Sequence, residues 1–161
     1  MTKLHSTGFL IVGLLCVAGM ASLAADKPDF SGTWVLNLKK SQLQIQEKLD
    51  SATFTIEHKE PDFRFRRVFV VEGKDDALSY ALTTDGKEKI DKQPGRTTVS
   101  RLTWDGNVLV LDERIVLADG REATNVVRYS LRDGGQTLVA EEKFRGPIHK
   151  HDNLWVADRR T

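Results

Sequence analysis

Asp-Gly dipeptides recur through the chain and separate short segments rich in valine, isoleucine, threonine, phenylalanine and tyrosine. The pairs are Asp85-Gly86, Asp105-Gly106, Asp119-Gly120 and Asp133-Gly134, and Glu72-Gly73-Lys74 forms a similar break earlier in the chain. Asp-Gly favours a tight hairpin, because both central residues of a type I′ turn need a positive φ that glycine and aspartate tolerate. A chain divided in this way is predicted to fold as sequential antiparallel hairpins, an up-and-down β meander.

The segments between these turns predict about ten strands. They lie near residues 31–39, 52–58, 63–72, 77–84, 87–92, 96–104, 107–117, 122–131, 136–144 and 150–158. Apolar side chains alternate along them, as at Leu78, Tyr80 and Leu82, so each strand has one apolar face. A meander of this size leaves two long edges unless the sheet closes around one interior. We therefore expect an all-β protein, a single antiparallel barrel with room inside, and a two-sheet sandwich is the alternative.

Residues 41–48 are the ambiguous segment. Ser41 and Gln44 stand at the spacing of a capping box, which predicts a helix of one or two turns. Leu43 and Ile45 instead alternate as they would in a strand. The expected fold therefore contains at most one short helix, near residues 41–48.

The N-terminus predicts a signal peptide over residues 1–24. Lys3 precedes an apolar run from Phe9 to Met20, which is shorter than the roughly 20 residues that span a bilayer. Ser22-Leu23-Ala24 then supplies small residues of the kind that signal peptidase recognises. We expect cleavage after Ala24, export to the periplasm or beyond the cell, and no stable membrane insertion afterwards. An uncleaved N-terminal anchor is the alternative.

Composition narrows the possible functions. The chain has 24 Lys+Arg and 23 Asp+Glu, and Lys3 is the single charged residue of the predicted signal, so the remainder is formally neutral. Neutrality argues against nucleic acid as a partner, because phosphate binding needs a basic surface. With Cys16 alone, neither a disulfide framework nor a zinc–cysteine cluster can form. His149-x-His151 lacks a third ligand at a metal-motif spacing, so no metal or other cofactor is expected.

The segment Phe30-Ser31-Gly32-Thr33-Trp34 resembles the opening strand of the calycin superfamily, which contains the lipocalins and fatty-acid-binding proteins. In that superfamily a Gly-x-Trp on the first strand packs against a basic residue at the end of the last strand. The resemblance implies that Gly32 and Trp34 close one end of the barrel, with Arg159 or Arg160 as the partner. Residues 25–161 also resemble small exported bacterial lipocalin-like proteins of unsettled function, which carry a segment like Thr83–Glu88, Thr-Thr-Asp-Gly-Lys-Glu. Residues 25–161 are thus expected to form one lipocalin-like β-barrel domain.

The segment from Phe63 to Phe69, Phe-Arg-Phe-Arg-Arg-Val-Phe, is the most unusual stretch. Alternation places Phe63, Phe65 and Arg67 on one face. If that face is inward, Arg67 is an interior cation that needs an anion. The anion could be a ligand carboxylate or phosphate, held bidentately, or the side chain of Glu113 or Glu142. A position in solvent at the barrel mouth is the third interpretation.

The sequence predicts a monomeric binding protein for a small hydrophobic or amphipathic molecule, with Arg67 as the anchor for an anionic group. The candidate lining residues are Phe63, Phe65, Arg67, Tyr80, Leu111, Glu113, Val127 and Tyr129. No catalytic residues are expected, because the adjacent carboxylates Asp112-Glu113 and Glu141-Glu142 point to opposite faces of their strands. The alternative is a filled barrel that binds a protein partner through its outer surface or an edge strand, with outward-facing Arg64 and Arg66.

Overall fold

The computed structural model describes residues 27–44 and 48–160 and confirms the all-β prediction. Its ten strands are β1 (Gly32–Leu36), β2 (Leu49–Lys59), β3 (Asp62–Val71), β4 (Lys74–Thr83), β5 (Lys89–Gln93), β6 (Arg96–Asp105), β7 (Val108–Leu117), β8 (Glu122–Arg132), β9 (Thr137–Arg145) and β10 (Lys150–Arg159). A single 3-10 turn, η1 (Asp133–Gly135), joins β8 to β9. The predicted signal peptide over residues 1–24 lies outside the described residues.

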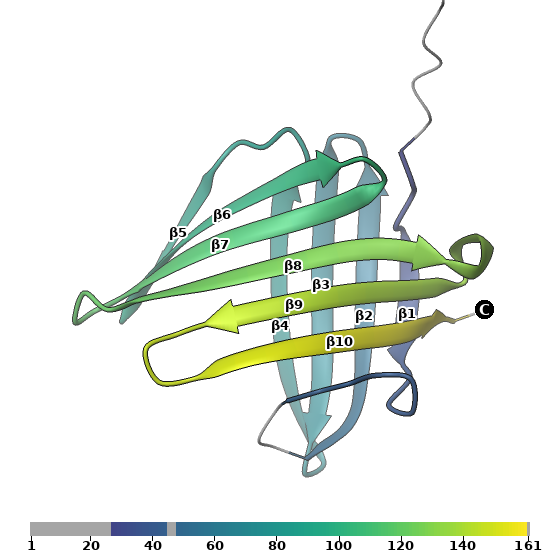
Figure 1. Cartoon of the computed structure of the whole chain (residues 1–161), viewed down its shortest axis with the longest axis horizontal. Helices are drawn as coiled ribbons and strands as arrows, with labels where there is room; N and C mark the ends of the chain where they lie inside the picture. The colour runs from purple at the N-terminus through teal and green to yellow at the C-terminus, as the bar shows by residue number, and fades with distance from the viewer. Residues whose placement is uncertain (1–26, 45–47, 161) are drawn as a thin grey trace, which may run out of the picture.

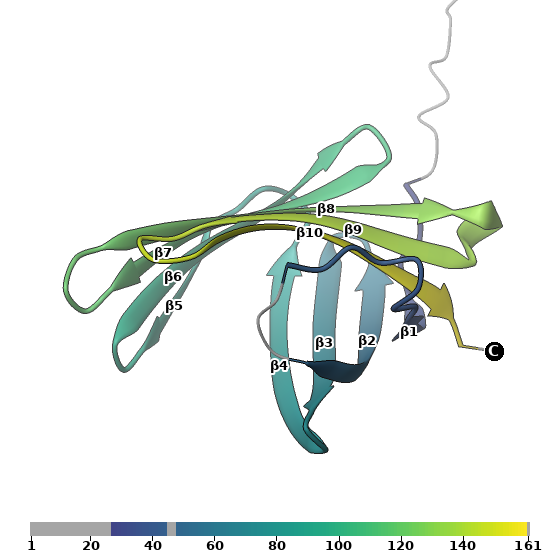
Figure 2. The ribbon, with the colours of Figure 1, turned by 60° about the horizontal axis from the view of Figure 1, so that its bottom comes forward.

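The strands form one continuous antiparallel sheet in the order β4-β3-β2-β1-β10-β9-β8-β7-β6-β5. The first and last strands pair with each other, with Trp34 opposite Arg159, so the meander curls back on itself. Strands β1–β4 cross the strands β5–β10, and the interior lies between these two groups (Figures 1 and 2). Because β4 and β5 end the sheet order and do not pair, the barrel is nearly closed.

The Asp-Gly pairs all lie between strands, as predicted, but not all of them form tight hairpins. The strands β4 and β5 on either side of Asp85-Gly86 do not pair, and Asp133-Gly134 lies in η1. In the β6–β7 hairpin Asp105 pairs with Val108, and Gly106 between them has a φ of 58°. This left-handed conformation is the one that glycine adopts at low cost, which is why the dipeptide predicts the turn.

The connection between β1 and β2 differs from the predicted helix. Gln42 forms an isolated antiparallel bridge with Leu154, and the main-chain N–H of Gln44 donates to Asn153 Oδ1 at 2.7 Å. Residues 41–44 thus extend alongside β10 and satisfy its free main-chain groups, while residues 45–47 lie outside the described part of the chain. Across residues 27–44 and 48–160, we find no helix with the length and apolar character needed to cross a membrane.

The two ends of the barrel are packed differently. At one end Phe30, Trp34, Phe63 and Leu109 are fully buried. Toward the other end, inward-facing side chains of β3 and β4 are partly exposed, and Leu78 is 38% accessible to solvent. One end is therefore sealed by side chains, and the interior is reached from the other.

Candidate ligand-binding site

A cavity of about 270 Å³ lies between the two groups of strands. Most of its lining is apolar or aromatic: Phe54, Phe65, Phe69, Leu78, Tyr80, Leu111, Val127, Tyr129, Leu138, Ala140, Trp155 and Ala157. The polar lining consists of Arg67, Glu113, Asn125, Glu142, His151 and Asn153. A concave, mainly apolar space with a few polar groups is typical of sites that bind small molecules.

Most of the predicted site residues come together in this cavity. Those that line it are Phe65, Arg67, Tyr80, Leu111, Glu113, Val127 and Tyr129. Phe63 does not line it, and this part of the prediction is wrong. Its ring is fully buried at the sealed end, 5.7 Å from the ring of His58 and 6.3 Å from that of Tyr129. Alternation identifies the inward face of a strand correctly but does not say how deep along the barrel each residue lies.

The inward side chains of β6–β10 form cross-strand rows. The row nearest the open end begins with Ser100, Glu113 and Asn125, each directly opposite the next. The following row contains Leu102, Leu111, Val127, Glu142 and Asn153. The third row contains Trp104, Leu109, Tyr129, Ala140 and Trp155. Polarity therefore increases from the sealed end toward the opening.

Glu113 and Asn125 form the polar pair of the outer row. The Ser100 hydroxyl donates to Glu113 Oε1 at 3.1 Å, and Asn125 Nδ2 donates to Glu113 Oε2 at 3.0 Å. Asn125 Oδ1 is buried and has no hydrogen-bond partner among the described residues. A buried amide oxygen without a donor is unfavourable, since it has lost its hydration without replacement.

Glu142, in the next row, accepts two hydrogen bonds on one of its oxygens. Its Oε2 accepts hydrogen bonds from Asn153 Nδ2 at 2.8 Å and Trp155 Nε1 at 2.9 Å, and His151 Nε2 lies 3.8 Å away. Asn153 in turn accepts from the main-chain N–H of Gln44. The carboxylate thus fixes the β1–β2 connection and the indole of Trp155 against the cavity wall.

Arg67 points inward, but its partner is neither Glu113 nor Glu142. Its Nη1 lies 3.0 Å from Asp76 Oδ2, and its guanidinium carbon lies 4.0 Å from the centre of the Phe69 ring. The strand predicted near residues 77–84 left Asp76 outside it. The observed β4 begins at Lys74 and brings Asp76 opposite Phe69, diagonal to Arg67 on the same face. The positive charge of Arg67 is therefore already compensated at the barrel mouth.

Two tyrosines bridge the cavity between the two groups of strands. The hydroxyl oxygens of Tyr80 and Tyr129 share a hydrogen bond of 3.2 Å, and Phe65 stacks on Tyr80 with ring centres 5.0 Å apart. Burial raises the pKa of both tyrosine hydroxyls, and the negative charge of Glu113 raises it further. Both hydroxyls therefore stay neutral near pH 7.

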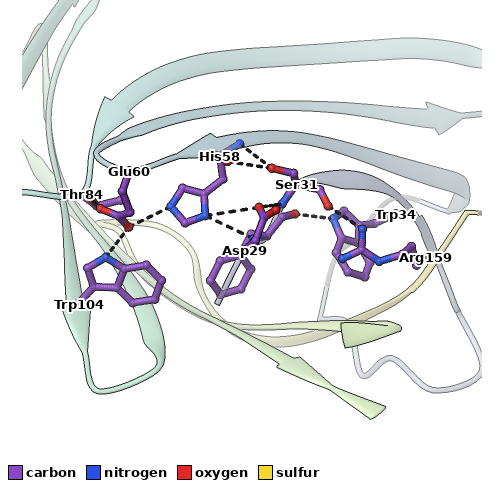
Figure 3. Close-up of polar contacts among 9 residues, drawn as sticks. Asp29, Ser31, Trp34, His58, Glu60, Thr84, Trp104 and Arg159 are labelled. Atoms are coloured by element: carbon purple, nitrogen blue, oxygen red, sulfur yellow. Dashed lines mark hydrogen bonds and ion pairs between the residues drawn. The ribbon is translucent and has the colours of Figure 1, made fainter. Parts of the chain in front are cut away.

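At the sealed end, Arg159 covers Trp34 (Figure 3). The guanidinium carbon lies 4.1 Å from the centre of the indole, Nη1 donates to the carbonyl of Ser31 at 2.6 Å, and Nε donates to the carbonyl of Gly135 at 2.9 Å. Gly32 has a φ of 144°, and a Cβ there would lie 2.5 Å from Arg159 Nη1. This is the arrangement of Gly32, Trp34 and Arg159 that the resemblance implied.

A second polar group at the sealed end is centred on Glu60, in the β2–β3 turn (Figure 3). Its carboxylate accepts hydrogen bonds from the Thr84 hydroxyl, from Trp104 Nε1 at 2.8 Å and from His58 Nε2 at 3.0 Å. The main-chain N–H of Phe30 donates to the other ring nitrogen of His58. Partial burial raises the pKa of Glu60, but the three hydrogen bonds outweigh this and hold that pKa below its usual range.

The two histidines considered as metal ligands are separated. His151 lines the cavity and stacks on Phe144 with ring centres 5.0 Å apart, whereas His149 is exposed before β10 begins. Within residues 27–44 and 48–160, no three His, Cys, Asp or Glu side chains are grouped so that they could hold a metal ion.

Sequence reasoning missed several lining residues. Asn125 lies on the same face as Val127 and Tyr129, so extending that alternation by one step would have found it. Glu142 was considered only as a partner for Arg67. Trp155 and Asn153 share a face of β10, but no sequence signal shows that this face is opposite β3 and β4.

No known family model matches the chain, and no curated protein matches it in sequence. A secretory abundant heat soluble protein from Ramazzottius varieornatus has a TM-score of 0.56 at 10% identity, over 81% of this chain and 94% of its own. Zebrafish ileal bile acid-binding protein complexed with cholic acid has a TM-score of 0.53 at 13% identity, over 81% and 98% of the two chains. Lipid binding protein 8 of Caenorhabditis elegans has a TM-score of 0.52 at 11% identity, over 81% and 95%. At these identities the similarity shows the fold alone, an antiparallel β-barrel like that of the proteins named, and the predicted barrel is confirmed at that level.

Proposed function

We propose that this protein is an exported, monomeric binding protein that holds a small, mainly apolar ligand inside its barrel. The observation that carries the proposal is the apolar cavity at the open end of a barrel whose other end is packed. The bile acid-binding and lipid binding proteins that share the fold support this class of ligand and a role in binding rather than catalysis.

Affinity would come from burial of the ligand's apolar surface against a wall that already exists. Each 100 Å² of apolar surface removed from water contributes about 2.5 kcal/mol. The strands that carry the wall are fixed on both sides by neighbouring strands, except for β4 and β5. Ligand binding therefore costs the protein less conformational entropy, because most of the wall is already ordered.

The polar end of an amphipathic ligand has two candidate positions. Arg67 is the anchor expected for an anion, but a ligand carboxylate would have to replace or share Asp76. The pair Glu113–Asn125 offers hydrogen-bond acceptors instead.

The alternative of a filled barrel acting through its outer surface has less support, because the interior contains a cavity. The outward-facing Arg64 is exposed and forms a 3.4 Å ion pair with Glu57, an arrangement that needs no partner.

A neutral fluorescent probe, N-phenyl-1-naphthylamine, tests ligand binding directly. We expect its fluorescence to rise and shift to the blue on binding. Ala140→Phe, which puts a ring into the cavity, should weaken probe binding by at least about tenfold, a loss of roughly 1.4 kcal/mol of binding free energy. Ala77→Phe makes the same change on the exposed outer face of β4 and should leave probe binding unchanged. Equal binding by both variants and the parent would contradict the proposal.

Native mass spectrometry of protein purified from an exporting host tests export and oligomeric state. We expect a single chain with the mass of residues 25–161. An additional mass that disappears on denaturation would be a retained ligand. A chain that keeps residues 1–24, or a stable dimer, would contradict these parts of the proposal.

A further inference from the structure

The strongest indication of what the cavity binds is a buried hydrogen-bond acceptor, Asn125 Oδ1, that has no donor among the described residues. Asn125 uses its Nδ2 to donate to Glu113, which fixes the orientation of the amide and directs Oδ1 away from that carboxylate. Asn125 lines the cavity wall, and its Oδ1 is buried and has no donor among the described residues. A ligand that brings an N–H or O–H group to this position would remove the cost of the unpaired oxygen.

The charge around this position is negative. Glu113 is hydrogen-bonded by two neutral groups, the Ser100 hydroxyl and the Asn125 amide, and forms no ion pair within the described residues. Glu142 places a second carboxylate on the same wall. Arg67 is the one Arg or Lys side chain of the lining, and Asp76 compensates it. A cation is thus favoured over an anion, because a partly buried carboxylate gains most from a charged donor.

We propose that the ligand carries a protonated primary amine, which donates to Asn125 Oδ1 and to the Glu113 carboxylate. Its alkyl chain would extend past Leu111 and Val127, the next inward residues on β7 and β8, toward the sealed end. This assignment rests on the proposed function and names the chemical class of the ligand. An ammonium group has three donors and no acceptor, so it suits a site that offers acceptors alone.

Glu142 is a weaker candidate for the same role. Its Oε2 already accepts from Asn153 and Trp155, and these bonds hold the β1–β2 connection in place. Glu142 has no buried oxygen without a partner, so a ligand amine there would relieve no such cost, whereas at Asn125 it satisfies an unpaired oxygen.

Three probes with the same ten-carbon chain separate the possible head groups. Decylammonium, decanol and decanoate are used below their micelle concentrations at pH 7 to displace N-phenyl-1-naphthylamine. We expect decylammonium to bind about tenfold more tightly than decanol, since a charged donor forms hydrogen bonds roughly twice as strong as a neutral one. Decanoate should bind more weakly than decanol.

Two variants assign the effect to the pair. Glu113→Gln keeps the size of the side chain and removes its charge. The affinity for decylammonium should therefore fall about tenfold, while the affinity for decanol should change by less than about twofold. Asn125→Leu removes the acceptor Oδ1 and should weaken the binding of both decylammonium and decanol. Asp112→Asn is the matched control, because it removes a carboxylate from the neighbouring, outward-facing position of β7, where Asp112 pairs with Arg101.

The outcomes that overturn the assignment are distinct from failure of the proposed function. Decanol binding as tightly as decylammonium would overturn the amine. Decanoate binding most tightly, with the preference lost in Arg67→Ala, would place an anionic group at Arg67 instead. If N-phenyl-1-naphthylamine and all three probes fail to bind a folded protein, the cavity is not a ligand site and the proposed function fails with it.

Discussion

Gly32 shows how one residue without a side chain can define the end of a barrel. Its φ of 144° is unfavourable for any other residue, and Arg159 Nη1 occupies the space that a Cβ would take. We expect Gly32→Ala to lower the free energy of unfolding by about 2–4 kcal/mol, since it combines backbone strain with displacement of the guanidinium from Trp34. Urea denaturation monitored by tryptophan fluorescence measures the loss.

Gly95→Ala separates these two costs. Gly95 has a φ of 84° in the β5–β6 turn, and a Cβ there would meet nothing within 4 Å. This variant should lose only about 1 kcal/mol, from the backbone alone. If both variants lose the same amount, the close approach of Arg159 to Gly32 contributes nothing to stability.

At the scale of elements, Glu60 joins parts of the barrel that no strand pairing connects. It lies in the β2–β3 turn, yet it accepts hydrogen bonds from Trp104 on β6 and from Thr84, which follows β4. The bond from Trp104 links the β2–β3 turn and the end of β4 to β6, across the gap between the unpaired strands β4 and β5. Side-chain hydrogen bonds to the Glu60 carboxylate therefore hold this part of the barrel together, whereas elsewhere in the sheet main-chain hydrogen bonds join neighbouring strands.

Glu60→Gln should lower the free energy of unfolding by about 1–2 kcal/mol at pH 7, toward the lower end for charged hydrogen bonds because the side chain is 45% exposed. The hydrogen bonds lower the pKa of Glu60 in the folded state, so its contribution is present above the ordinary pKa of 4.5 and is lost as pH falls through the folded-state value. The difference between parent and variant, measured by urea denaturation, should therefore shrink below about pH 4.5.

The control is Glu57→Gln, which removes an exposed carboxylate with one long ion pair near the end of β2, the strand that precedes Glu60. It should change stability by less than about 0.5 kcal/mol at either pH. A constant difference between parent and Glu60→Gln from neutral to acid pH would show that the charge of Glu60 is not what holds the gap.

The elements themselves were readable from the sequence because their signals are local. Turn glycines and period-two alternation depend on neighbouring residues, and they placed every strand within a few residues of its observed bounds. The start of β4 shows the limit. Three residues of strand were assigned to a turn, and with them Asp76, the partner of Arg67. The extra residues are held by pairing with β3, a contact that hydrophobic alternation does not report because their side chains are polar.

At the scale of the whole molecule, the depth of each residue along the barrel was not predictable. Phe63 and Phe65 share a face and a residue type, but the first seals the closed end and the second lines the cavity. The strands β1–β4 cross β5–β10 (Figure 2), and at one end His58 packs against both Phe63 and Trp104. Toward its other end β3 is only partly buried. Such crossing depends on long-range pairing of β1 with β10, which no local pattern encodes.

The same asymmetry predicts how the molecule opens. Strand β10 lies between β1 and β9 and carries buried Trp155 and Ala157, whereas β5 is an edge strand whose five side chains are all exposed. Native-state hydrogen exchange should therefore show the amides of β5 exchanging at least about a hundredfold faster than those of β10, because β5 can separate from β6 without unfolding the core. Bound N-phenyl-1-naphthylamine should slow exchange around Phe65 and Val127 and leave β5 unaffected. Protection of β5 equal to that of β10 would mean that this edge is covered, and if that protection fell on dilution, the cover would be a second copy of the chain and the protein would not be a monomer.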